Sequence, residues 1–248
     1  MIQHQNILDI LQEFNLNGNQ IQYTPLTAGL INDTFLVTDD EKQQFILQKI
    51  NHKVFKNVGV LMNNINYALP FLTADDYAQI SFLPTKSGKN YLETNGGFWR
   101  IMTYIPDSTT YNTTTNSNIA FEAGRIVGGF HSLLKKGNVA LFKDTLPKFH
   151  HLDHRAQEFE EALATSEIQK REIAAKGIKK ARHFLKELQH LNTEKLPVRI
   201  CHNDTKLNNI LFSKTTDKAL CLIDLDTFMK GYFYYDFGDA IRTVVNVA

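Results

Sequence analysis

The chain has 248 residues, of which 43% are hydrophobic and 21% charged, and this composition indicates a folded, soluble protein. The net charge of +1 provides no basic surplus for a nucleic-acid partner, and no apolar run is long enough to cross a membrane. The first residues lack the charged and apolar regions of a signal peptide, so we expect a cytoplasmic protein.

The first hundred residues predict a small antiparallel sheet that carries one helix, after an initial helix at residues 7–14. Strand candidates lie at 21–23, 34–38, 44–50, 79–83 and 98–105, and the polar turn 39–42 makes the second and third a hairpin. The expected helix stops at Pro70, and its apolar face is formed by Val58, Leu61, Met62, Ile65 and Leu69.

The rest of the chain reads as mainly helical. Residues 107–118 are nearly all Ser, Thr and Asn, which predicts a loop and a boundary between two lobes. A buried helix face follows, marked by Ala123, Ile126, Val127, Phe130, Leu133 and Leu134. Helical spacing then continues over 156–190, with an interruption expected near Gly177. Cys201 and Cys221 lie in apolar strands and are expected to be buried, reduced thiols.

The most informative run is residues 201–209, Cys-His-Asn-Asp-Thr-Lys-Leu-Asn-Asn. The catalytic loop of kinase-like enzymes has the pattern H-x-D-x-x-x-x-N, in which the Asp takes or orients the substrate hydroxyl and the Asn holds magnesium. Asp204 and Asn209 have this spacing, and Lys206 lies where it could reach the transferring phosphoryl group. Asp224 closes the apolar strand 219–223, which predicts a second metal ligand facing the same loop. The alternative is that His202 and Asp204 merely cap a turn.

A second run, Asp236-Phe237-Gly238, spells the D-F-G with which protein kinases bind metal. No apolar strand leads into it, so we interpret Asp236 and Asp239 as a turn and the cap of a helix that begins near Ala240. Asp224 is the predicted ligand instead.

These elements together predict an α+β, bilobal, protein-kinase-like fold. The N-terminal lobe, residues 1–106, would be an antiparallel sheet with one helix that binds nucleotide. The C-terminal lobe, residues 107–248, would be mainly helical and would hold the catalytic and substrate residues.

Several runs in both lobes carry a resemblance to a known group. They are residues 26–35, 45–51, 54–57, 99–102, 201–212, 223–227 and 236–242. In these runs the chain resembles the aminoglycoside phosphotransferase and choline kinase superfamily, and within it the N-acetylhexosamine 1-kinases. The resemblance implies a cytoplasmic, Mg²⁺-dependent enzyme that moves the γ-phosphate of ATP to a sugar, at the anomeric hydroxyl of N-acetylglucosamine or N-acetylgalactosamine.

The resemblance also implies roles for individual residues. Asp204 would be the base, and Asn209 and Asp224 the metal ligands. The turn 29–34 would cover the phosphates, and the backbone of residues 102–105 would lie against adenine. The residues expected to bind ATP are Gly29, Asn32, Thr34, Gln48, Met102, Tyr104 and Ile105. One glycine is also common in an ordinary hairpin, so Gly29 alone does not indicate phosphate contact.

The chain differs from the kinase pattern at two places where many kinases carry a charged residue, and at its end. Gln48 stands where many kinases carry a strand Lys, and Lys49 points to the other face as a surface lysine. Asn63 and Asn64 stand where a helix Glu would pair with that Lys. Either phosphate charge is neutralised differently or nucleotide binding is weak. The chain stops at Ala248 within an expected helix, which suggests a C-terminally truncated fragment with uncovered apolar surface.

The resemblance places a similar Phe-His segment near the sugar, which makes His150 and Arg155 candidates for acceptor binding; the alternative is a surface loop. Asp33 is either a polar contact at the nucleotide or sugar or an Asx-type turn residue, and Asp226 is a further acceptor candidate. A metal site in the His-rich segment 150–154 is disfavoured because its spacing matches no standard zinc pattern and Asp153 suits a helix N-cap. His131 reads as a partly buried histidine with satisfied hydrogen bonds.

Three rival functions stay open. The first is a kinase for choline, homoserine, another sugar or an aminoglycoside. The second is a nucleotide-binding pseudokinase, suggested by the missing strand Lys and helix Glu. The third is metal-dependent hydrolysis at Asp204, Asp224 and Asp226. In each kinase reading the partner is a small molecule; the sequence indicates no oligomeric state.

Overall fold

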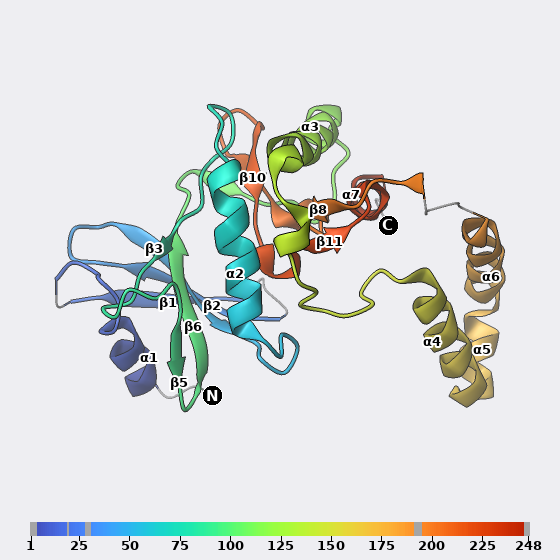
Figure 1. Ribbon diagram of the computed structural model, residues 1–248, viewed down its shortest axis with the longest axis horizontal. Helices are drawn as coiled ribbons and strands as arrows, with labels where there is room; N and C mark the ends of the chain where they lie inside the picture. The colour runs from blue at the N-terminus through green and yellow to red at the C-terminus, as the bar shows by residue number, and fades with distance from the viewer. Residues whose placement is uncertain (1–3, 19, 28–30, 191–194, 246–248) are drawn as a thin grey trace. The chain divides into compact units, whose positions relative to one another are not determined.

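The computed structural model describes residues 4–18, 20–27, 31–190 and 195–245 (Figure 1). The chain separates into two compact units. The first comprises Met1–Thr145 and Arg199–Ala248, and the second comprises Leu146–Val198.

An antiparallel sheet forms the early part of the first unit, with the strand order β1-β2-β3-β6-β4 and with β5 paired to β6. Its strands are β1 Gln22–Leu26, β2 Asp33–Thr38, β3 Gln44–Ile50, β4 Phe82–Leu83, β5 Leu92–Thr94 and β6 Gly97–Thr103. The predicted hairpin of β2 and β3 is confirmed. Its turn is fixed by Asp39, whose Oδ1 accepts the N–H groups of Glu41 at 3.0 Å and Gln43 at 2.9 Å.

The two faces of this sheet differ because side chains alternate along each strand. One face packs against helix α1, His4–Leu11, in a core that includes Phe35, Leu47 and Trp99. The opposite face carries Thr34, Gln48 and Arg100, which are directly paired across β2, β3 and β6. The second face is therefore polar at its centre, where most sheets of this size are apolar.

Helix α2, Val58–Ala68, begins at Asn57, whose side chain accepts the N–H of Val60 at 3.0 Å. It ends, as predicted, where Pro70 removes a backbone donor. Asn64 on its buried face donates to the carbonyls of Phe228 at 2.8 Å and Lys143 at 2.7 Å. These bonds tie α2 to the later part of the same unit, beside which it runs in Figure 1.

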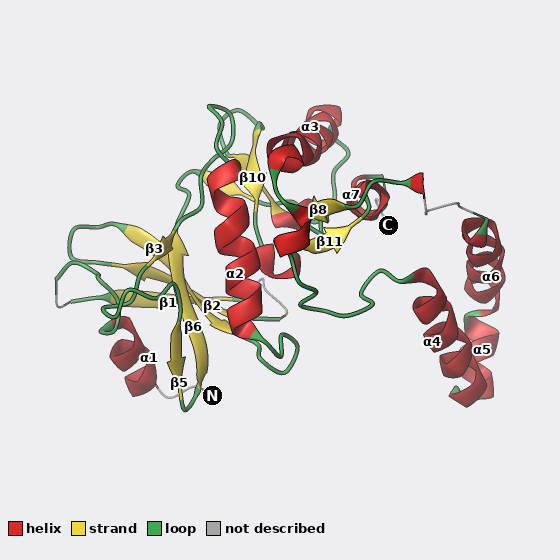
Figure 2. Ribbon diagram, in the orientation of Figure 1, coloured by secondary structure: helices red, strands yellow, loops and turns green. Residues whose placement is uncertain are grey.

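The later part of the first unit mixes helices with short strands (Figure 2). Its elements are β7 Ser108–Thr109, α3 Ser117–Leu133, β8 Arg199–Cys201, β9 Ile210–Ser213, β10 Ala219–Leu222, β11 Met229–Gly231 and α7 Phe233–Val244. One small sheet has the order β10-β9-β7, and β11 pairs with β8. The predicted loop 107–118 thus contains one short strand.

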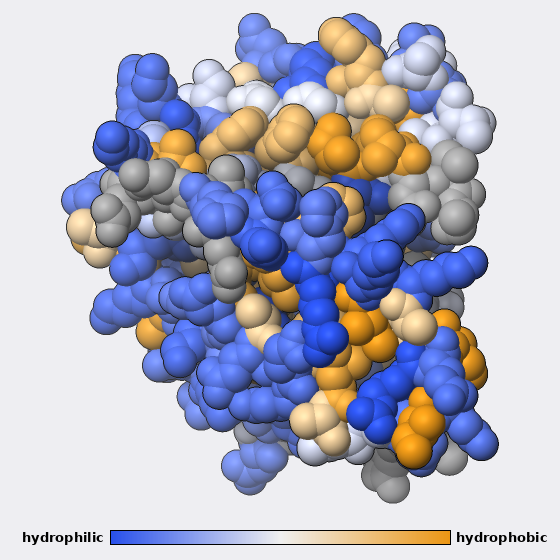
Figure 3. All heavy atoms as spheres, turned by 90° about the vertical axis from the view of Figure 1, so that its right-hand side faces the viewer, coloured by the Kyte–Doolittle hydropathy of each residue, from blue (hydrophilic) through white to orange (hydrophobic). Residues whose placement is uncertain are grey.

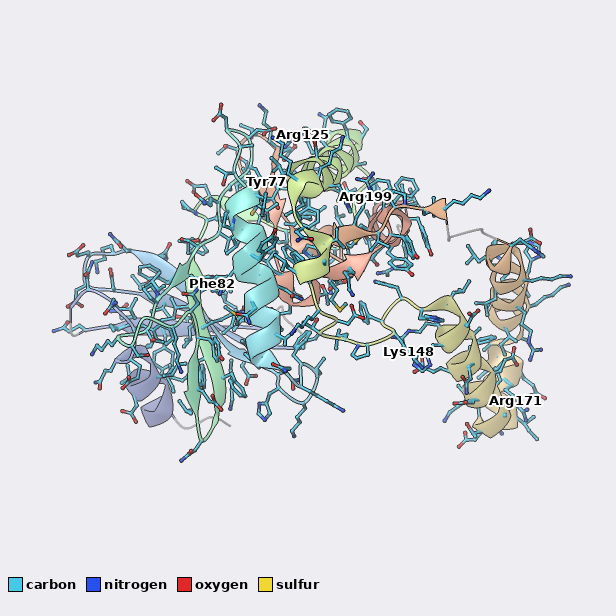
Figure 4. All side chains as sticks on the ribbon, viewed as in Figure 1. Tyr77, Phe82, Arg125, Lys148, Arg171 and Arg199 are labelled. Carbon is cyan, nitrogen blue, oxygen red and sulfur yellow. The ribbon has the colours of Figure 1, made fainter. Side chains whose placement is uncertain are left out.

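The turn that follows α2 contacts β10 directly. The Tyr77 hydroxyl accepts the N–H of Leu222 at 3.2 Å, and the N–H of Ala78 donates to Leu220 at 2.8 Å. Arg125 of α3 donates to the Ala219 carbonyl at 2.7 Å at the start of the same strand. Tyr77 and Arg125 are labelled in Figure 4. These contacts hold the strand that leads to Asp224.

Both cysteines are free and buried, as predicted. Burial raises the pKa of the Cys221 thiol to about 12, and burial, with the charge of Asp236, also raises the pKa of Cys201. Both thiols are therefore protonated at neutral pH.

The second unit is helical, with α4 Leu152–Thr165, α5 Ile168–Ile173 and α6 Ala175–Gln189. The guanidinium of Arg182 joins α6 to α4 by two hydrogen bonds to Glu160, at 3.0 and 2.7 Å. The interruption expected near Gly177 lies instead at Ser166–Glu167 and at Ala174, and Gly177 is within α6. The N-cap of α4 is His151 and not Asp153, which lies in the first turn.

The predicted α+β fold, with an N-terminal antiparallel sheet and a mostly helical later part, is confirmed. Large apolar side chains remain exposed on α5, α6 and α7, and Figure 3 shows groups of hydrophobic atoms among hydrophilic ones. They include Ile173, Phe184, Leu188, Phe233, Phe237 and Val245. Among the described helices, none has the length and hydropathy required to span a bilayer.

Candidate active site

The loop between β8 and β9 brings three of the predicted residues together. Asp204 Oδ2 accepts hydrogen bonds from Asn209 Nδ2 and from Lys206 Nζ, each at 2.8 Å. Asn209 Nδ2 also donates to the Asp204 carbonyl at 2.9 Å. The spacing of the motif therefore brings Asp204, Lys206 and Asn209 into contact within one turn of the chain.

These contacts leave two oxygens available. Both partners of Asn209 Nδ2 are acceptors, so the amide is oriented with its Oδ1 away from Asp204. Asp204 Oδ1 accepts no hydrogen bond from any residue that the structure describes, and the side chain is 20% exposed. One carboxylate oxygen and one amide oxygen can thus bind groups from outside the chain.

His202 connects this loop to the strand end that carries Asp224. Its Nε2 donates to the Ile223 carbonyl at 2.9 Å, and its Nδ1 accepts the N–H of Asp204 at 3.3 Å. Both bonds are satisfied only by the neutral ring with its proton on Nε2. Complete burial lowers the pKa of His202, which favours the same neutral form. His202 is therefore part of the framework, as a turn residue rather than a proton carrier.

Asp224 follows β10 in a left-handed conformation, with φ and ψ both 60°. Such a backbone is uncommon for a residue other than glycine and is found often at functional sites. Its carboxylate forms no hydrogen bond or ion pair with the described residues. Burial, together with the negative charges of Asp226 and Asp204, raises the pKa of Asp224 to about 6. The position therefore suits a bound cation.

Asp236 anchors the same loop, a role that the sequence interpretation missed. Its carboxylate is fully buried and accepts the N–H groups of His202 at 2.9 Å and Asn203 at 2.6 Å. His131 Nε2 donates to it at 2.8 Å, and Thr205 Oγ1 donates to its carbonyl at 2.5 Å. His131 is thus a buried histidine with satisfied hydrogen bonds, as predicted.

The interpretation of Asp236 as a cap was wrong because α7 begins at Phe233 and not near Ala240. The aromatic run before Asp236 has no regular apolar period, so it hid the first turn of the helix. Atoms of His131, Cys201 and Asp236 lie within 4.8 Å of one another. The Asp236 oxygens are already used by three donors, so we treat this group as framework.

Residues of the sheet and of the turn before β2 contact Asp226, two residues after Asp224. Asn32 Nδ2 donates to Asp226 Oδ2 at 2.7 Å, and Arg100 forms an ion pair with Asp226 Oδ1 at 2.6 Å. Gln48 Oε1 accepts from Arg100, and Gln48 Nε2 donates to Thr34 Oγ1 at 3.3 Å. The predicted residues Asn32, Thr34, Gln48 and Asp226 are therefore connected to one another.

Residues 22–247 match the phosphotransferase enzyme family. The chain belongs to this family. Membership agrees with the placement of Asp204, Asn209 and Asp224 around one turn and one strand end.

Solved structures of other phosphotransferases share this fold. An amicoumacin kinase bound to AMP-PNP and Ca²⁺ is 16% identical with a TM-score of 0.65; the match covers 97% of this chain and 69% of that one. A spectinomycin phosphotransferase with ADP and spectinomycin is 12% identical with a TM-score of 0.63, covering 95% and 72%. A microcompartment-associated aminopropanol kinase is 15% identical with a TM-score of 0.64, covering 96% and 73%. At these identities the likeness shows the fold alone.

The donor atoms of this phosphotransferase fit a magnesium ion. Mg²⁺ prefers oxygen ligands, commonly one or two carboxylates completed by water and phosphate. Asn209 offers an amide oxygen, and Asp224 offers a carboxylate that forms no hydrogen bond or ion pair with the described residues. Asp226 differs, because its Oδ2 accepts from Asn32 and its charge is balanced by the Arg100 guanidinium, 2.6 Å from Oδ1.

The raised pKa of Asp224 predicts how metal binding and stability depend on pH. Because the folded pKa of about 6 exceeds the usual 3.8, the folded protein keeps a proton that the unfolded chain has lost. Without metal, its stability should fall as pH rises between these two values. The Mg²⁺ dissociation constant should rise roughly tenfold per pH unit below about pH 6 and level off above it.

Calorimetric titration of Mg²⁺ between pH 5 and pH 8 measures this dependence. Asp224→Asn should remove both the pH dependence and most of the affinity. An Mg²⁺ affinity that is constant over the range would contradict the assignment of Asp224 as a ligand.

The remaining predicted residues lie as follows. Met102 is in β6 between β3 and β4, and Tyr104 and Ile105 follow that strand, where Ser108 Oγ donates to the Ile105 carbonyl at 2.6 Å. Asp33 is exposed and opposite Lys49, whose Nζ lies over the Trp99 ring on the other face from Gln48, as predicted. Gly29 lies outside the described residues.

His150 and Arg155 are in the second unit. Arg155 is exposed and makes local contacts, with Nε donating to the Phe149 carbonyl at 2.8 Å and an ion pair to Glu158 at 2.6 Å. The ring of His150 lies 4.5 Å from that of Phe149. These contacts do not test a role in acceptor binding.

Proposed function

We propose that this phosphotransferase is a Mg²⁺-dependent kinase that moves the γ-phosphate of ATP to the anomeric hydroxyl of an N-acetylhexosamine. The observation that carries the kinase assignment is the pair of available oxygens on Asp204 and Asn209, near the Asp224 carboxylate, which has no hydrogen-bond partner among the described residues. The sugar acceptor is supported by the resemblance of several runs in both halves of the chain.

Asp204 would act on the acceptor hydroxyl. Its Oδ2 is held by Asn209 and Lys206, which leaves Oδ1 to contact the acceptor. There it would orient the hydroxyl and take its proton as the acceptor oxygen attacks the γ-phosphorus. The bond to the oxygen between the β- and γ-phosphorus atoms breaks, and ADP leaves with that oxygen.

Asn209 and Asp224 would hold the metal, which supplies charge neutralisation at the phosphates when bound. Lys206 adds a positive charge next to Asp204, where it stabilises the ionised base and lies close to the incoming phosphoryl group. Positioning and charge account for most of the catalysis of phosphoryl transfer, and these four residues supply both.

We further propose that residues 1–106 bind the nucleotide and residues 107–248 the acceptor. Gly29, Asn32, Thr34 and Gln48 would lie near the phosphates, and the backbone of Met102, Tyr104 and Ile105 near adenine. His150 and Arg155 are acceptor candidates on the resemblance alone, and Asp33 is a candidate contact for the nucleotide or the sugar.

An acceptor panel tests this proposal. ATP consumption would be measured with Mg²⁺ and, in turn, N-acetylglucosamine, N-acetylgalactosamine, choline, homoserine, kanamycin, spectinomycin and aminopropanol. We expect turnover with the N-acetylhexosamines and a sugar 1-phosphate as the product. Turnover with another acceptor alone would support the kinase assignment and refute the N-acetylhexosamine as the acceptor. Tight nucleotide binding without turnover on any acceptor would favour the pseudokinase.

A further inference from the structure

A buried cation lies at the centre of the sheet face that carries the site. Arg100 of β6 is 1% exposed, and its guanidinium lies over the ring of Phe82 at 5.6 Å. The Arg100 Nε and Nη2 atoms donate to Gln48 Oε1 at 3.1 and 2.8 Å. The Nη1 atom contacts Asp226 Oδ1 at 2.6 Å. An arginine is rarely buried to this degree unless a specific charge requires it.

The strand register explains why Gln48 is not a lysine. Thr34, Gln48 and Arg100 are direct cross-strand partners, so they form one row on one face of the sheet. A lysine at Gln48 would place a second positive charge beside Arg100. A neutral glutamine instead accepts from Arg100 and donates to Thr34, which fixes the guanidinium toward Asp226.

Helix α2 supplies no carboxylate to this cation. It offers the Met62 thioether, whose Sδ is 3.7 Å from Arg100. In kinases with a strand Lys and a helix Glu, that pair must be in place for phosphoryl transfer. In this chain the cation of the ion pair is Arg100 on β6, and not a lysine on β3. The carboxylate is Asp226, two residues after Asp224, and not a glutamate on α2.

Asp226 sits in a short turn that is attached to the catalytic loop. Its Oδ2 accepts from Asn32, and the Thr145 hydroxyl donates to its carbonyl at 3.2 Å. The next residue, Thr227, donates to the His202 carbonyl at 2.6 Å. A displacement of Asp226 would therefore move both the Asp224 backbone and the loop that carries Asp204.

We propose that Arg100 and Asp226 form the positioning pair of this active site, with Gln48 orienting Arg100. The pair holds the left-handed turn at Asp224 in the orientation in which its carboxylate meets the metal. Asp226 is then a positioning residue and not an acceptor or metal ligand, so the metal is bound by one carboxylate, Asp224, and by Asn209. The proposal rests on the proposed function of the same site.

The test compares single and double replacements of the pair. Arg100→Met leaves a buried carboxylate unpaired and is expected to fold poorly, so the informative variant is Arg100→Met/Asp226→Leu, in which both charges are replaced by apolar groups of similar size. Arg100→Lys keeps the positive charge but lacks the separate guanidinium nitrogens that contact Gln48 and Asp226. The matched control is Arg182→Met, which breaks the exposed ion pair between Arg182 of α6 and Glu160 of α4.

Four quantities are measured for each variant. They are the thermal unfolding midpoint from the fluorescence of Trp99, the single tryptophan, the Mg²⁺ dissociation constant by calorimetry, and kcat and KM for ATP. For the double variant we expect an unfolding midpoint close to the wild type. Its Mg²⁺ dissociation constant should rise about tenfold and its kcat fall about 100-fold, with a nearly unchanged KM for ATP at saturating Mg²⁺. Arg100→Lys should lie between it and the wild type, and Arg182→Met should leave all of these quantities close to the wild type.

A double variant that is stable and binds Mg²⁺ like the wild type would overturn the proposal, because the pair would then serve stability only. That outcome is distinct from failure of the proposed function, in which the wild type itself binds no Mg²⁺ and transfers no phosphate.

Discussion

Replacing Asp204 by asparagine should lower turnover by about 10²- to 10⁴-fold and leave the binding of ATP with Mg²⁺ nearly unchanged. Asparagine retains an oxygen that can accept from Lys206 and Asn209, so the loop should keep its shape. It places an amide nitrogen at the position of Oδ1, where a proton acceptor is needed. Steady-state kinetics and calorimetric binding of AMP-PNP measure the two effects.

The same isosteric change at Asp217 is the control, because this residue lies in the exposed turn between β9 and β10 and its carboxylate accepts only two long hydrogen bonds of 3.5 Å from the described residues. Asp217→Asn should have wild-type turnover. A similar turnover for Asp204→Asn and the wild type would refute the role of Asp204 as the base.

Replacing Asp236 by alanine should have the largest effect on stability. It leaves the buried N–H groups of His202 and Asn203 and the ring of His131 without their acceptor. A buried donor that loses its partner costs about 1–3 kcal/mol, so we expect a loss of about 3 kcal/mol or more. Urea unfolding followed by Trp99 fluorescence measures the change.

Asp239→Ala is the comparison, since Asp239 lies on the same helix and pairs with Arg242, which is exposed. Its replacement should change the free energy of unfolding by about 1 kcal/mol at most. Equal effects of the two replacements would mean that Asp236 does not anchor the loop.

Local spacing was sufficient to predict the center of the site. Asp204 and Asn209 are five residues apart in one turn, so their contact follows from the motif itself. Asp224 ends an apolar strand, and the strand was recognised from its composition. The sheet and α2 were predicted for a similar reason, because hydrophobic period and the position of Pro70 are properties of short segments.

Contacts between distant segments could not be predicted in this way. Asp236 meets His202 through α7, and the aromatic run before it hides the start of that helix. Arg100 meets Asp226 through the sheet register, which no local pattern gives. One signal was present: a single arginine in the apolar strand 98–105 needs a buried partner. The partner itself is fixed only by the fold.

Binding of AMP-PNP with and without Mg²⁺, compared among the wild type, Asp204→Asn, Asn209→Leu and Asp224→Asn, tests the central claim most directly. We predict that Mg²⁺ tightens binding to the wild type and to Asp204→Asn, and has little effect on the other two variants. Mg²⁺-independent binding to the wild type, or loss of the Mg²⁺ effect in Asp204→Asn alone, would contradict a phosphotransfer site built from these three residues.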